Sequence, residues 1–194
     1  MEPIFFTSSA ELRQWFEQNH ERETELIVGL YKKGTDKPSI TWEELVDQAL
    51  CFGWIDGVSK RIDNERWQIR VTPRKPNSVW SKKNIASFER LTQLGLMQPA
   101  GLKAFSQRKE DKSGIYSFEQ GEVKLDEAEE QQLQSNPKAW EFFQKQPPSY
   151  KKSVIWWIIS AKKPETRVKR LATLIEDSEN GRTVRQFTRR TWAK

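Results

Sequence analysis

Hydrophobic positions along the chain recur with two different periods. After Thr41 they follow the i, i+3, i+4 spacing of a helix that buries one stripe, and no position through Leu50 breaks this spacing. Other segments are short, rich in β-branched and aromatic residues and bounded by turn residues, which is the pattern of strands. These segments are residues 26–31, 55–62 and 67–71. Because only residues 63–66 separate the last two, we expect them to form a hairpin.

The second arm of this hairpin has two different faces. Apolar Trp67, Ile69 and Val71 alternate with polar and cationic residues, so one face is predicted to be core and the other basic. We expect Pro73 to end the pairing, because proline has no amide hydrogen to donate.

Capping residues mark the helix ends in the first half of the chain. Ser8 with Glu11, and Thr41 with Glu44, fit the capping box, in which a hydroxyl accepts from a first-turn amide and the glutamate reaches back. Gly53 is typical of a helix stop. Both caps therefore predict helices.

Two more helices are expected before residue 110. One runs from Ser81 to about Leu94. Another begins at Pro99, which suits the first turn of a helix, and places Leu102 and Phe105 inward.

The second half of the chain is predicted to be helical after an aperiodic segment. Residues 110–124 contain two glycines and no sustained period, which is typical of a linker or mobile loop. Helices then begin at Asp126, at Asn136 and at Pro164. One inward stripe comprises Tyr150, Val154, Trp157, Ile158 and Ala161, and that of the last helix comprises Val168, Leu171, Ala172 and Ile175.

These elements predict an α+β fold: a small antiparallel sheet with helices in an N-terminal domain, followed by a helical C-terminal domain. The expected boundaries are 1–110 for the α+β domain, 111–124 for the linker, 125–181 for the helical domain and 182–194 for a basic tail.

Composition narrows the class of protein. Nine Trp, ten Phe and 36% hydrophobic residues are enough for a core, and no apolar run approaches the ~20 residues that cross a bilayer. The start of the chain lacks the basic and apolar regions of a signal peptide, so we expect a soluble, cytoplasmic protein. Since Cys51 and His20 are the only residues of their kinds, we expect no zinc site, no internal disulfide and no cofactor.

Charge is distributed in blocks. Residues 1–56 carry 5 basic and 11 acidic side chains, whereas 57–90 carry 9 and 3; residues 91–150 carry 7 and 9, and 151–194 carry 12 and 4. The blocks are compatible with charge complementarity within the molecule. They are also compatible with a surface that binds a polyanion such as nucleic acid.

The first candidate site is Trp54-Ile55-Asp56-Gly57. An aspartate beside glycine at the start of a strand could point into a crevice where Trp54 lowers the local dielectric and raises the pKa of Asp56, as general acid–base catalysis requires. Alternatively, Asp56 binds backbone amides and stabilises the strand start. Asp56 is the weak catalytic candidate of this chain.

The second candidate is the run Ser78-Val79-Trp80-Ser81-Lys82-Lys83-Asn84. Ser78 or Ser81 is a natural N-cap, and exposed amides beside Arg74, Lys75, Lys82 and Lys83 would attract a phosphate or a carboxylate. The alternative is a cap with Trp80 as a packing anchor. The predicted ligand-binding residues of the chain are Trp54, Asp56, Arg61, Arg70, Arg74, Ser78, Trp80, Ser81, Lys82 and Asn84.

The third candidate is the basic face of the hairpin, whose alternative is an ordinary solvated sheet face. It comprises Lys60, Arg61, Arg66, Arg70 and Arg74. In the tail, Phe187 and Trp192 are interleaved with five basic residues, and such a segment can stack on bases or pack back on the protein.

Several separated motifs resemble one known family. They are residues 51–57 (CFGWIDG), 72–84 (TPRKPNSVWSKKN), 95–102 and 160–167 (SAKKPETR). Over nearly the whole chain they look like the bacteriocin-protection, YdeI/OmpD-associated family. The resemblance implies a role in protection against bacteriocins or antimicrobial peptides and a link to an outer-membrane protein, and it supplies no catalytic residues.

The sequence therefore predicts a non-enzymatic binding protein, associated with bacteriocin protection or envelope stress, that recognises a small anion or a phosphate-bearing ligand. A nucleic-acid or nucleotide binder is the alternative. A hydrolase or transferase that uses Asp56 is the third possibility.

Overall fold

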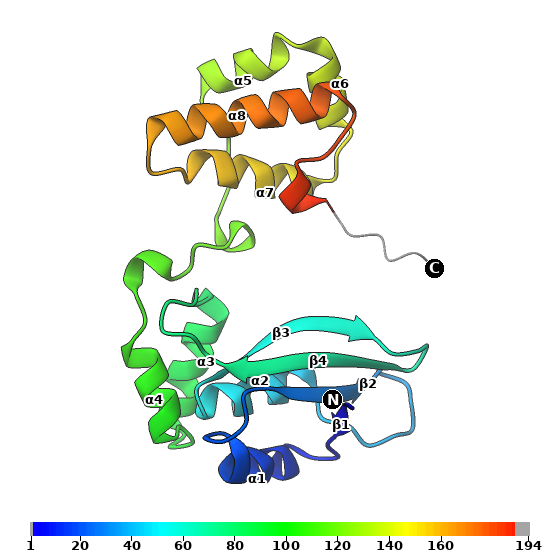
Figure 1. The fold of residues 1–194 in the computed structure, drawn as a ribbon, viewed down its shortest axis with the longest axis vertical. Coiled ribbons are helices and arrows are strands. Elements are labelled where there is room, and N and C mark those ends of the chain that lie inside the picture. Colours follow the sequence, from blue (N-terminus) through cyan, green and yellow to red (C-terminus); the bar gives the residue numbers. More distant parts are fainter. Residues whose placement is uncertain (1, 189–194) are drawn as a thin grey trace. The chain divides into compact units, whose positions relative to one another are not determined.

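The computed structural model describes residues 2–188 and divides the chain into two compact units, Met1–Ile115 and Tyr116–Lys194 (Figure 1). The N-terminal unit contains a sheet and helices, and the C-terminal unit is helical. The predicted fold class is confirmed. Among the described residues no helix has the length and apolarity needed to cross a membrane.

The sheet has four strands in the order β1-β2-β4-β3. They are β1 (Ile4–Phe5), β2 (Leu26–Tyr31), β3 (Trp54–Arg61) and β4 (Arg66–Pro73). The three longer strands pair antiparallel, and β4 ends at Pro73 as predicted. The short β1 adds a parallel pair with β2 that was not predicted, because two residues are too few to show an alternating pattern.

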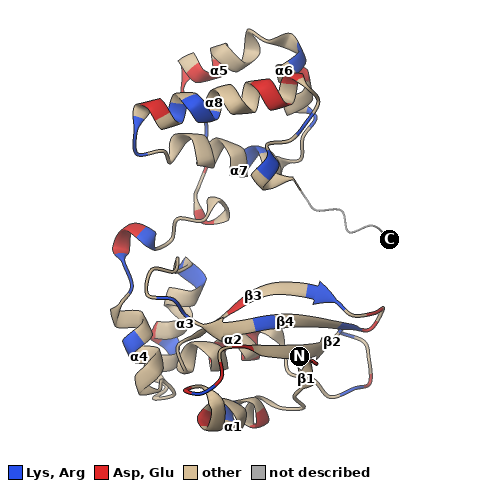
Figure 2. Cartoon of the chain, in the orientation of Figure 1, with Lys and Arg blue, Asp and Glu red and all other residues tan. Residues whose placement is uncertain are grey.

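Four helices complete the N-terminal unit: α1 (Ser9–Asn19), α2 (Trp42–Cys51), α3 (Lys82–Gln93) and α4 (Pro99–Ser106). Thr41 and Glu44 form the predicted capping box of α2. Ser8 caps α1 as predicted, but the Glu11 carboxylate accepts from the Thr7 amide at 2.7 Å, one residue before the cap. Figure 2 shows acidic and basic residues on both units.

The core of the N-terminal unit joins the sheet to its helices. Alternate residues Leu26, Val28 and Leu30 of β2 are buried, and the α2 stripe packs in the same cluster. Cys51 is buried, and burial raises the pKa of its thiol.

The approach of α4 to the end of α2 depends on two glycines. Gly53, after the end of α2, has φ +75°, which favours glycine, and a Cβ there would lie 2.7 Å from the carbonyl oxygen of Ala100. A Cβ on Gly101 would lie 2.3 Å from the carbonyl oxygen of Cys51. Backbone thus packs against backbone where α4 meets α2. This packing leaves Leu102 46% exposed, so the prediction that Leu102 faces inward is wrong. Phe105 packs against the core, as predicted.

The C-terminal unit contains α5 (Glu127–Gln134), α6 (Pro137–Gln144), α7 (Pro148–Ile159) and α8 (Pro164–Glu179) around a second core. Short 3₁₀ turns lie at Glu110–Lys112, Ser117–Glu119 and Arg185–Phe187. Asp126 and Asn136 cap α5 and α6 as predicted.

The inward stripe of α8 differs from the prediction. Leu171 is buried as expected, but Val168 is 64% exposed and Ala172 is also exposed, while Leu174 and Ser178 are buried instead. The buried positions follow i, i+3, i+7, the spacing of one helical face, and Ile175 packs against the core as predicted. The buried face therefore shares Leu171 and Ile175 with the predicted one and is rotated away from Val168 and Ala172.

The aperiodic segment 110–124 contains the division between the units. Its first part is hydrogen bonded to the N-terminal unit: the Trp80 amide donates to Lys112 O at 3.0 Å, and the Gly114 amide donates to Trp80 O at 2.8 Å. Residues 111–114 therefore extend the N-terminal unit.

Candidate functional site

Several predicted site residues of the N-terminal unit contact one another, because Arg74 contacts Ser78 and Trp80 and lines one cavity with Trp54. Trp54 is 1% exposed and packs edge-on against Trp15 and Phe16, with ring centroids 6.0 and 5.5 Å apart. The expectation that Trp54 forms an open crevice with Asp56 is therefore wrong, because its indole is part of the core.

Asp56 is half-buried on β3 and already has a side-chain partner. Its Oδ2 accepts a hydrogen bond at 3.1 Å from the indole Nε1 of Trp42, the first residue of α2. The ammonium of Lys83, in the first turn of α3, lies 4.4 Å from the centroid of the Trp42 ring. Asp56 and Lys83 thus contact one indole from two different elements, and Asp56 helps to hold that indole in place.

Arg74 is turned into the protein. Its side chain is buried, its guanidinium lies 3.7 Å from the centroid of the buried Trp80 ring, and its Nη1 donates to Ser78 Oγ at 3.3 Å and to Val79 O at 3.1 Å. Arg74 and Ser78 therefore shape the loop before α3. Trp80 is 2% exposed, as the packing-anchor alternative expects.

Ser81 is the N-cap of α3, as predicted. Its Oγ accepts from the Asn84 amide at 3.0 Å, and the residue is only 9% exposed. Lys82 is exposed, and its stem runs alongside Gly114, where an added Cβ would lie 3.1 Å from two of its carbons. At the helix start that was predicted to bind an anion, Ser81 thus satisfies one first-turn amide, and the Lys82 stem packs beside residue 114.

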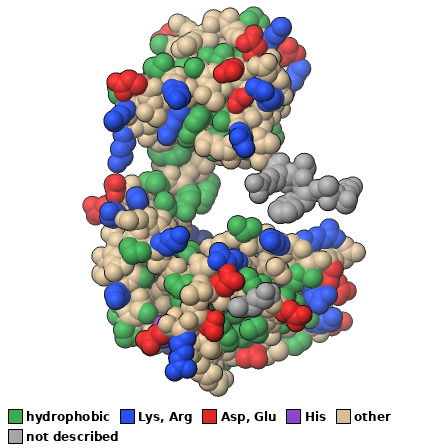
Figure 3. Space-filling view, in the orientation of Figure 1, with side chains coloured by type: hydrophobic (Ala, Val, Ile, Leu, Met, Phe, Trp, Pro, Cys, Tyr) green, Lys and Arg blue, Asp and Glu red, His purple; other side chains and the backbone are tan. Residues whose placement is uncertain are grey.

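Carboxylates lie beside several cations of the hairpin. Arg70 pairs with Glu25 at 2.7 Å, and Arg66 pairs with Asp63 at 2.6 Å. A hydrogen bond from Arg66 lowers the pKa of Asp63 to about 2. Arg61 donates to the carbonyl of Asp63 and to the side chain of Asn64 in the same turn. Figure 3 shows basic and acidic side chains interspersed over the visible face of this unit, which fits charge complementarity within the molecule.

A cavity that the sequence analysis missed lies where the β2–α2 loop meets the sheet. Its volume is about 480 Å³. Its wall includes three aromatic residues from three elements, Tyr31, Trp42 and Trp67, and three lysines of the loop, Lys32, Lys33 and Lys37. This is the size of a small-molecule site.

The loop around this cavity is held at several points. The Tyr31 amide donates to Ser39 Oγ at 3.2 Å, and the Thr35 amide donates to Lys32 O at 3.3 Å. The Lys37 ammonium lies 5.1 Å from the Tyr31 ring centroid. These contacts keep the basic loop close to the aromatic wall.

The charge of the cavity wall is positive. Its described residues include three lysines and one carboxylate, Glu43. Among the residues that the structure describes, no carboxylate lies within ion-pair distance of Lys32 or Lys33, and Lys37 is 3.9 Å from Glu65 with both side chains more than half exposed. The arrangement can attract an anion and can place a flat or apolar group against aromatic rings.

The sequence contained a usable signal for this cavity. Residues 32–37 (KKGTDK) place three lysines around a glycine directly before the capped helix that begins at Trp42. Trp42 itself is half-buried and packs against the core, so part of its side chain is accessible.

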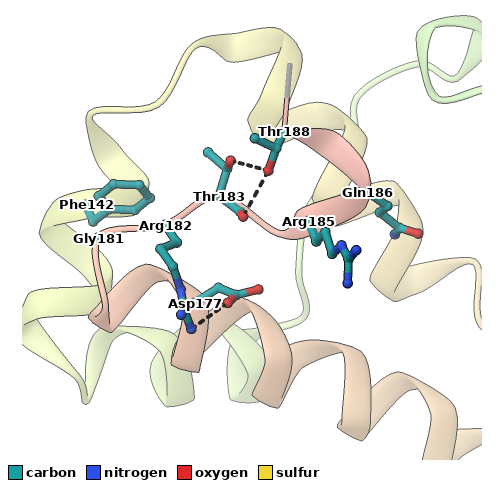
Figure 4. Close-up of a pocket in the computed structure, with 8 residues that line it drawn as sticks. All are labelled: Phe142, Asp177, Gly181, Arg182, Thr183, Arg185, Gln186 and Thr188. Carbon is teal, nitrogen blue, oxygen red and sulfur yellow. Dashed lines mark hydrogen bonds and ion pairs between the residues drawn. The ribbon is translucent and has the colours of Figure 1, made fainter. Parts of the chain in front are cut away.

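Two other cavities contain residues that the sequence analysis discussed. One cavity of about 330 Å³ is lined by Trp54 and Arg74 together with His20 and Lys103. In the C-terminal unit, a wide cavity of about 1080 Å³ is lined by the Gly181–Thr188 segment, where Arg182 faces Asp177 at 3.1 Å (Figure 4). The tail residues from 189 onward, including Trp192, lie outside the described residues.

Two further features bear on catalysis. His20 caps the end of α1, and its Nδ1 lies 2.8 Å from the Phe16 carbonyl oxygen. Within residues 2–188 no group of three or more His, Cys, Asp and Glu side chains is arranged to hold a metal ion.

Comparison with known families gives two matches. The profile described as "Domain of unknown function (DUF8412)" matches residues 4–104, and the profile described as "Bacteriocin-protection, YdeI or OmpD-Associated" matches residues 122–181. The second match confirms the resemblance and corrects its extent, because the motifs at 51–57 and 72–84 lie within the first match. No curated protein and no solved structure matches the chain.

Proposed function

We propose that this chain, which belongs to the DUF8412 family and carries a bacteriocin-protection, YdeI or OmpD-associated domain at residues 122–181, is a non-enzymatic protein that binds an anionic ligand through its N-terminal unit. The observation that carries the proposal is the cavity of about 480 Å³ whose wall combines Lys32, Lys33 and Lys37 with Trp42.

The physical basis is that lysines outnumber carboxylates in the lining of a cavity that also has a fixed aromatic wall. Lysines on an exposed loop attract an anion at long range, and this attraction falls with salt because charges more than about 10 Å apart are screened at 0.1 M ionic strength. A partly enclosed wall then adds short-range contacts that salt weakens much less. Binding of a lone anion should therefore be weak and salt-sensitive.

The geometry of Asp56 favours binding over catalysis. Its Oδ2 accepts from Trp42 Nε1, so the carboxylate orients a wall residue of the cavity. As a general base, Asp56 would have only Oδ1 for a reacting group while Oδ2 stays hydrogen bonded to Trp42. A hydrolase or transferase that uses Asp56 is accordingly the least supported of the three functions.

The cellular role in this proposal comes from the description of the second family. That description names bacteriocin protection and association with OmpD. To these we add envelope stress, a cytoplasmic location and a link to an outer-membrane protein as parts of the proposal. In this proposal the C-terminal unit is a helical domain, and the ligand is bound by the N-terminal unit.

The test is calorimetric titration of the full chain with inorganic pyrophosphate at low salt. In the double variant Lys33→Glu, Lys37→Glu we expect binding to weaken at least tenfold. The matched control is Lys138→Glu, Lys169→Glu, which changes the net charge equally through exposed residues of the C-terminal unit and should change binding less than twofold. Equal losses in both double variants would show that only net charge attracts the anion and would contradict the proposed site.

Nucleic acid remains the rival ligand, because lysines beside aromatic rings also suit single strands. The dependence of affinity on salt separates the two. A small anion gives a shallow slope of log affinity against log salt, whereas a strand that contacts many cations gives a steep one.

A further inference from the structure

We infer that the ligand of the β2–α2 cavity is a nucleotide: a planar, unsaturated ring lies against the aromatic wall while its phosphates meet the loop lysines. This inference rests on the proposed function. It adds a planar ring to the anionic ligand that the function requires. The cavity supplies both kinds of contact within one volume of about 480 Å³.

The first observation is that aromatic residues from three elements line the cavity. Tyr31 ends β2, Trp67 is the second residue of β4, and Trp42 begins α2. Each is half-buried, so part of each ring remains accessible. Leu30 pairs with Trp67 across β2 and β4, so Trp67 lies on the core-facing side of the sheet together with Leu30, whereas Tyr31, the next residue, points to the opposite face. A phosphate alone would gain nothing from such a wall.

The second observation is that the Trp42 ring is fixed in advance. Its Nε1 donates to Asp56 Oδ2, and Lys83 lies 4.4 Å from its centroid without being part of the cavity wall. Two contacts from outside the cavity thus hold an indole whose remaining surface faces the cavity. A preorganised ring loses little conformational entropy when a ligand stacks on it.

The third observation is that the cations of the wall come from the loop and its two tryptophans from α2 and the sheet. Lys32 and Lys33 follow Tyr31 directly, and Gly34, with φ +93°, turns the chain so that Lys37 returns to the Tyr31 ring. Lys37 thus lies against Tyr31, while Trp42 and Trp67 supply the rings of the α2 and sheet side. A ligand that satisfies both sides has an aromatic end and an anionic end.

The size of the cavity favours a mononucleotide over a longer nucleic acid. Small-molecule sites commonly enclose about 300 to 1,000 Å³. A volume of about 480 Å³ is within this range. A strand would instead need a basic groove that continues past the cavity, and carboxylates lie beside the neighbouring hairpin cations Arg66 and Arg70.

The experiment compares ADP with inorganic pyrophosphate on the full chain by calorimetry. We expect ADP to bind at least about tenfold more tightly, since stacking of one base on an aromatic side chain is worth about that factor. Trp42→Leu should abolish this difference between ADP and pyrophosphate. Trp42→Phe, which keeps a ring, should retain most of it. Trp140→Leu, a half-buried tryptophan of the C-terminal unit, is the matched control.

Each result decides a different claim. Equal affinities for ADP and pyrophosphate in the wild-type chain would overturn the nucleotide inference and leave the proposed anion site standing. Failure of both ligands to bind would overturn the proposed function itself. A 20-nucleotide single strand that binds at least tenfold more tightly than ADP would replace the mononucleotide with nucleic acid. Circular dichroism melts of each variant show whether a loss of binding comes from unfolding.

Discussion

The two units of the chain use basic side chains in different ways. In the C-terminal unit, Arg167 of α8 donates through Nη2 to Glu129 at 2.7 Å and to Asp126 at 3.1 Å, at the start of α5. The hydrogen bond from Arg167 lowers the pKa of Glu129. In the N-terminal unit, Lys32 and Lys33 are exposed over an aromatic cavity. A cation that is paired with a half-buried carboxylate joins helices, whereas exposed lysines keep their charge for a ligand.

The N-terminal unit also contains a structural cation. Arg74 is folded over Trp80, so its role resembles that of Arg167 more than that of the loop lysines. The environment of a basic residue, and not its position along the chain, therefore decides whether it is structural or available to a ligand. Substitutions of both kinds of residue can test this difference.

The largest effect is expected from Trp80→Ala. Trp80 is buried and packs edge-on against Phe105 at 5.1 Å as well as under Arg74. Truncation of a buried Trp commonly costs about 3 to 5 kcal/mol, so the free energy of unfolding should fall by that amount in a urea denaturation followed by circular dichroism. A loss below about 1 kcal/mol together with abolished ligand binding would instead make Trp80 the ligand residue that the sequence suggested.

Arg167→Met should destabilise the C-terminal unit by about 2 kcal/mol. The substitution leaves the half-buried carboxylate of Glu129 without its charged donor, and hydrogen bonds to charged groups contribute about 1.5 to 3 kcal/mol. The control is Lys145→Met, whose i,i+4 pair with Glu141 is 71% exposed on both sides and should contribute less than about 0.5 kcal/mol. Thermal unfolding measures both. Equal losses would mean that the Arg167 pair is no more structural than a surface pair.

Asp56→Asn should cost less than about 1 kcal/mol, because an amide oxygen can still accept from the Trp42 indole. Pyrophosphate binding should remain within twofold of the wild-type value. Asp56→Leu removes the acceptor, and we expect it to weaken ADP binding by releasing Trp42. A complete loss of binding in Asp56→Asn would indicate that the carboxylate itself meets the ligand.

The smallest expected effect is on the stability of the fold at low pH. The pKa of Asp63 is lowered to about 2 in the folded chain, first by its hydrogen bond from Arg66. A depressed carboxyl pKa stabilises the fold above the unfolded value of about 3.9, and this contribution is lost as the pH falls toward 2. Asp63→Asn should therefore reduce the pH dependence of the thermal midpoint between pH 5 and 2. An unchanged dependence in this variant would show that the turn does not couple to protonation.

Much of the fold was predictable because local signals agreed with packing. The box of Thr41 and Glu44 started α2 at the expected residue, and Leu26–Tyr31 formed the expected strand. The failures were long-range. Leu102 stays exposed because two glycines set how α4 meets α2, and that contact has no signature in the sequence around residue 102.

The candidate site was less predictable than the fold. Motif density pointed to Trp54 and Trp80, but a tryptophan in a dense motif is as suitable for a core as for a ligand, and both are buried. The cavity at Lys32–Lys37 depends on Tyr31, Trp42 and Trp67, which the sequence separates by up to 36 positions. Strand pairing places Trp67 at the end of β2, and the start of α2 brings Trp42 to the same cavity.

The central claim is that the anion site lies at the β2–α2 loop. Its most direct test is a nitrogen-15 NMR titration of the full chain with pyrophosphate at low salt. The account predicts that the amides of Lys32 to Lys37 and the indole signal of Trp42 shift together along one binding curve, and that the amides of Ser81 to Asn84 stay in place. Shifts centred on Ser81 to Asn84, or on Arg182 to Thr188 in the C-terminal unit, with the loop amides unmoved, would contradict it.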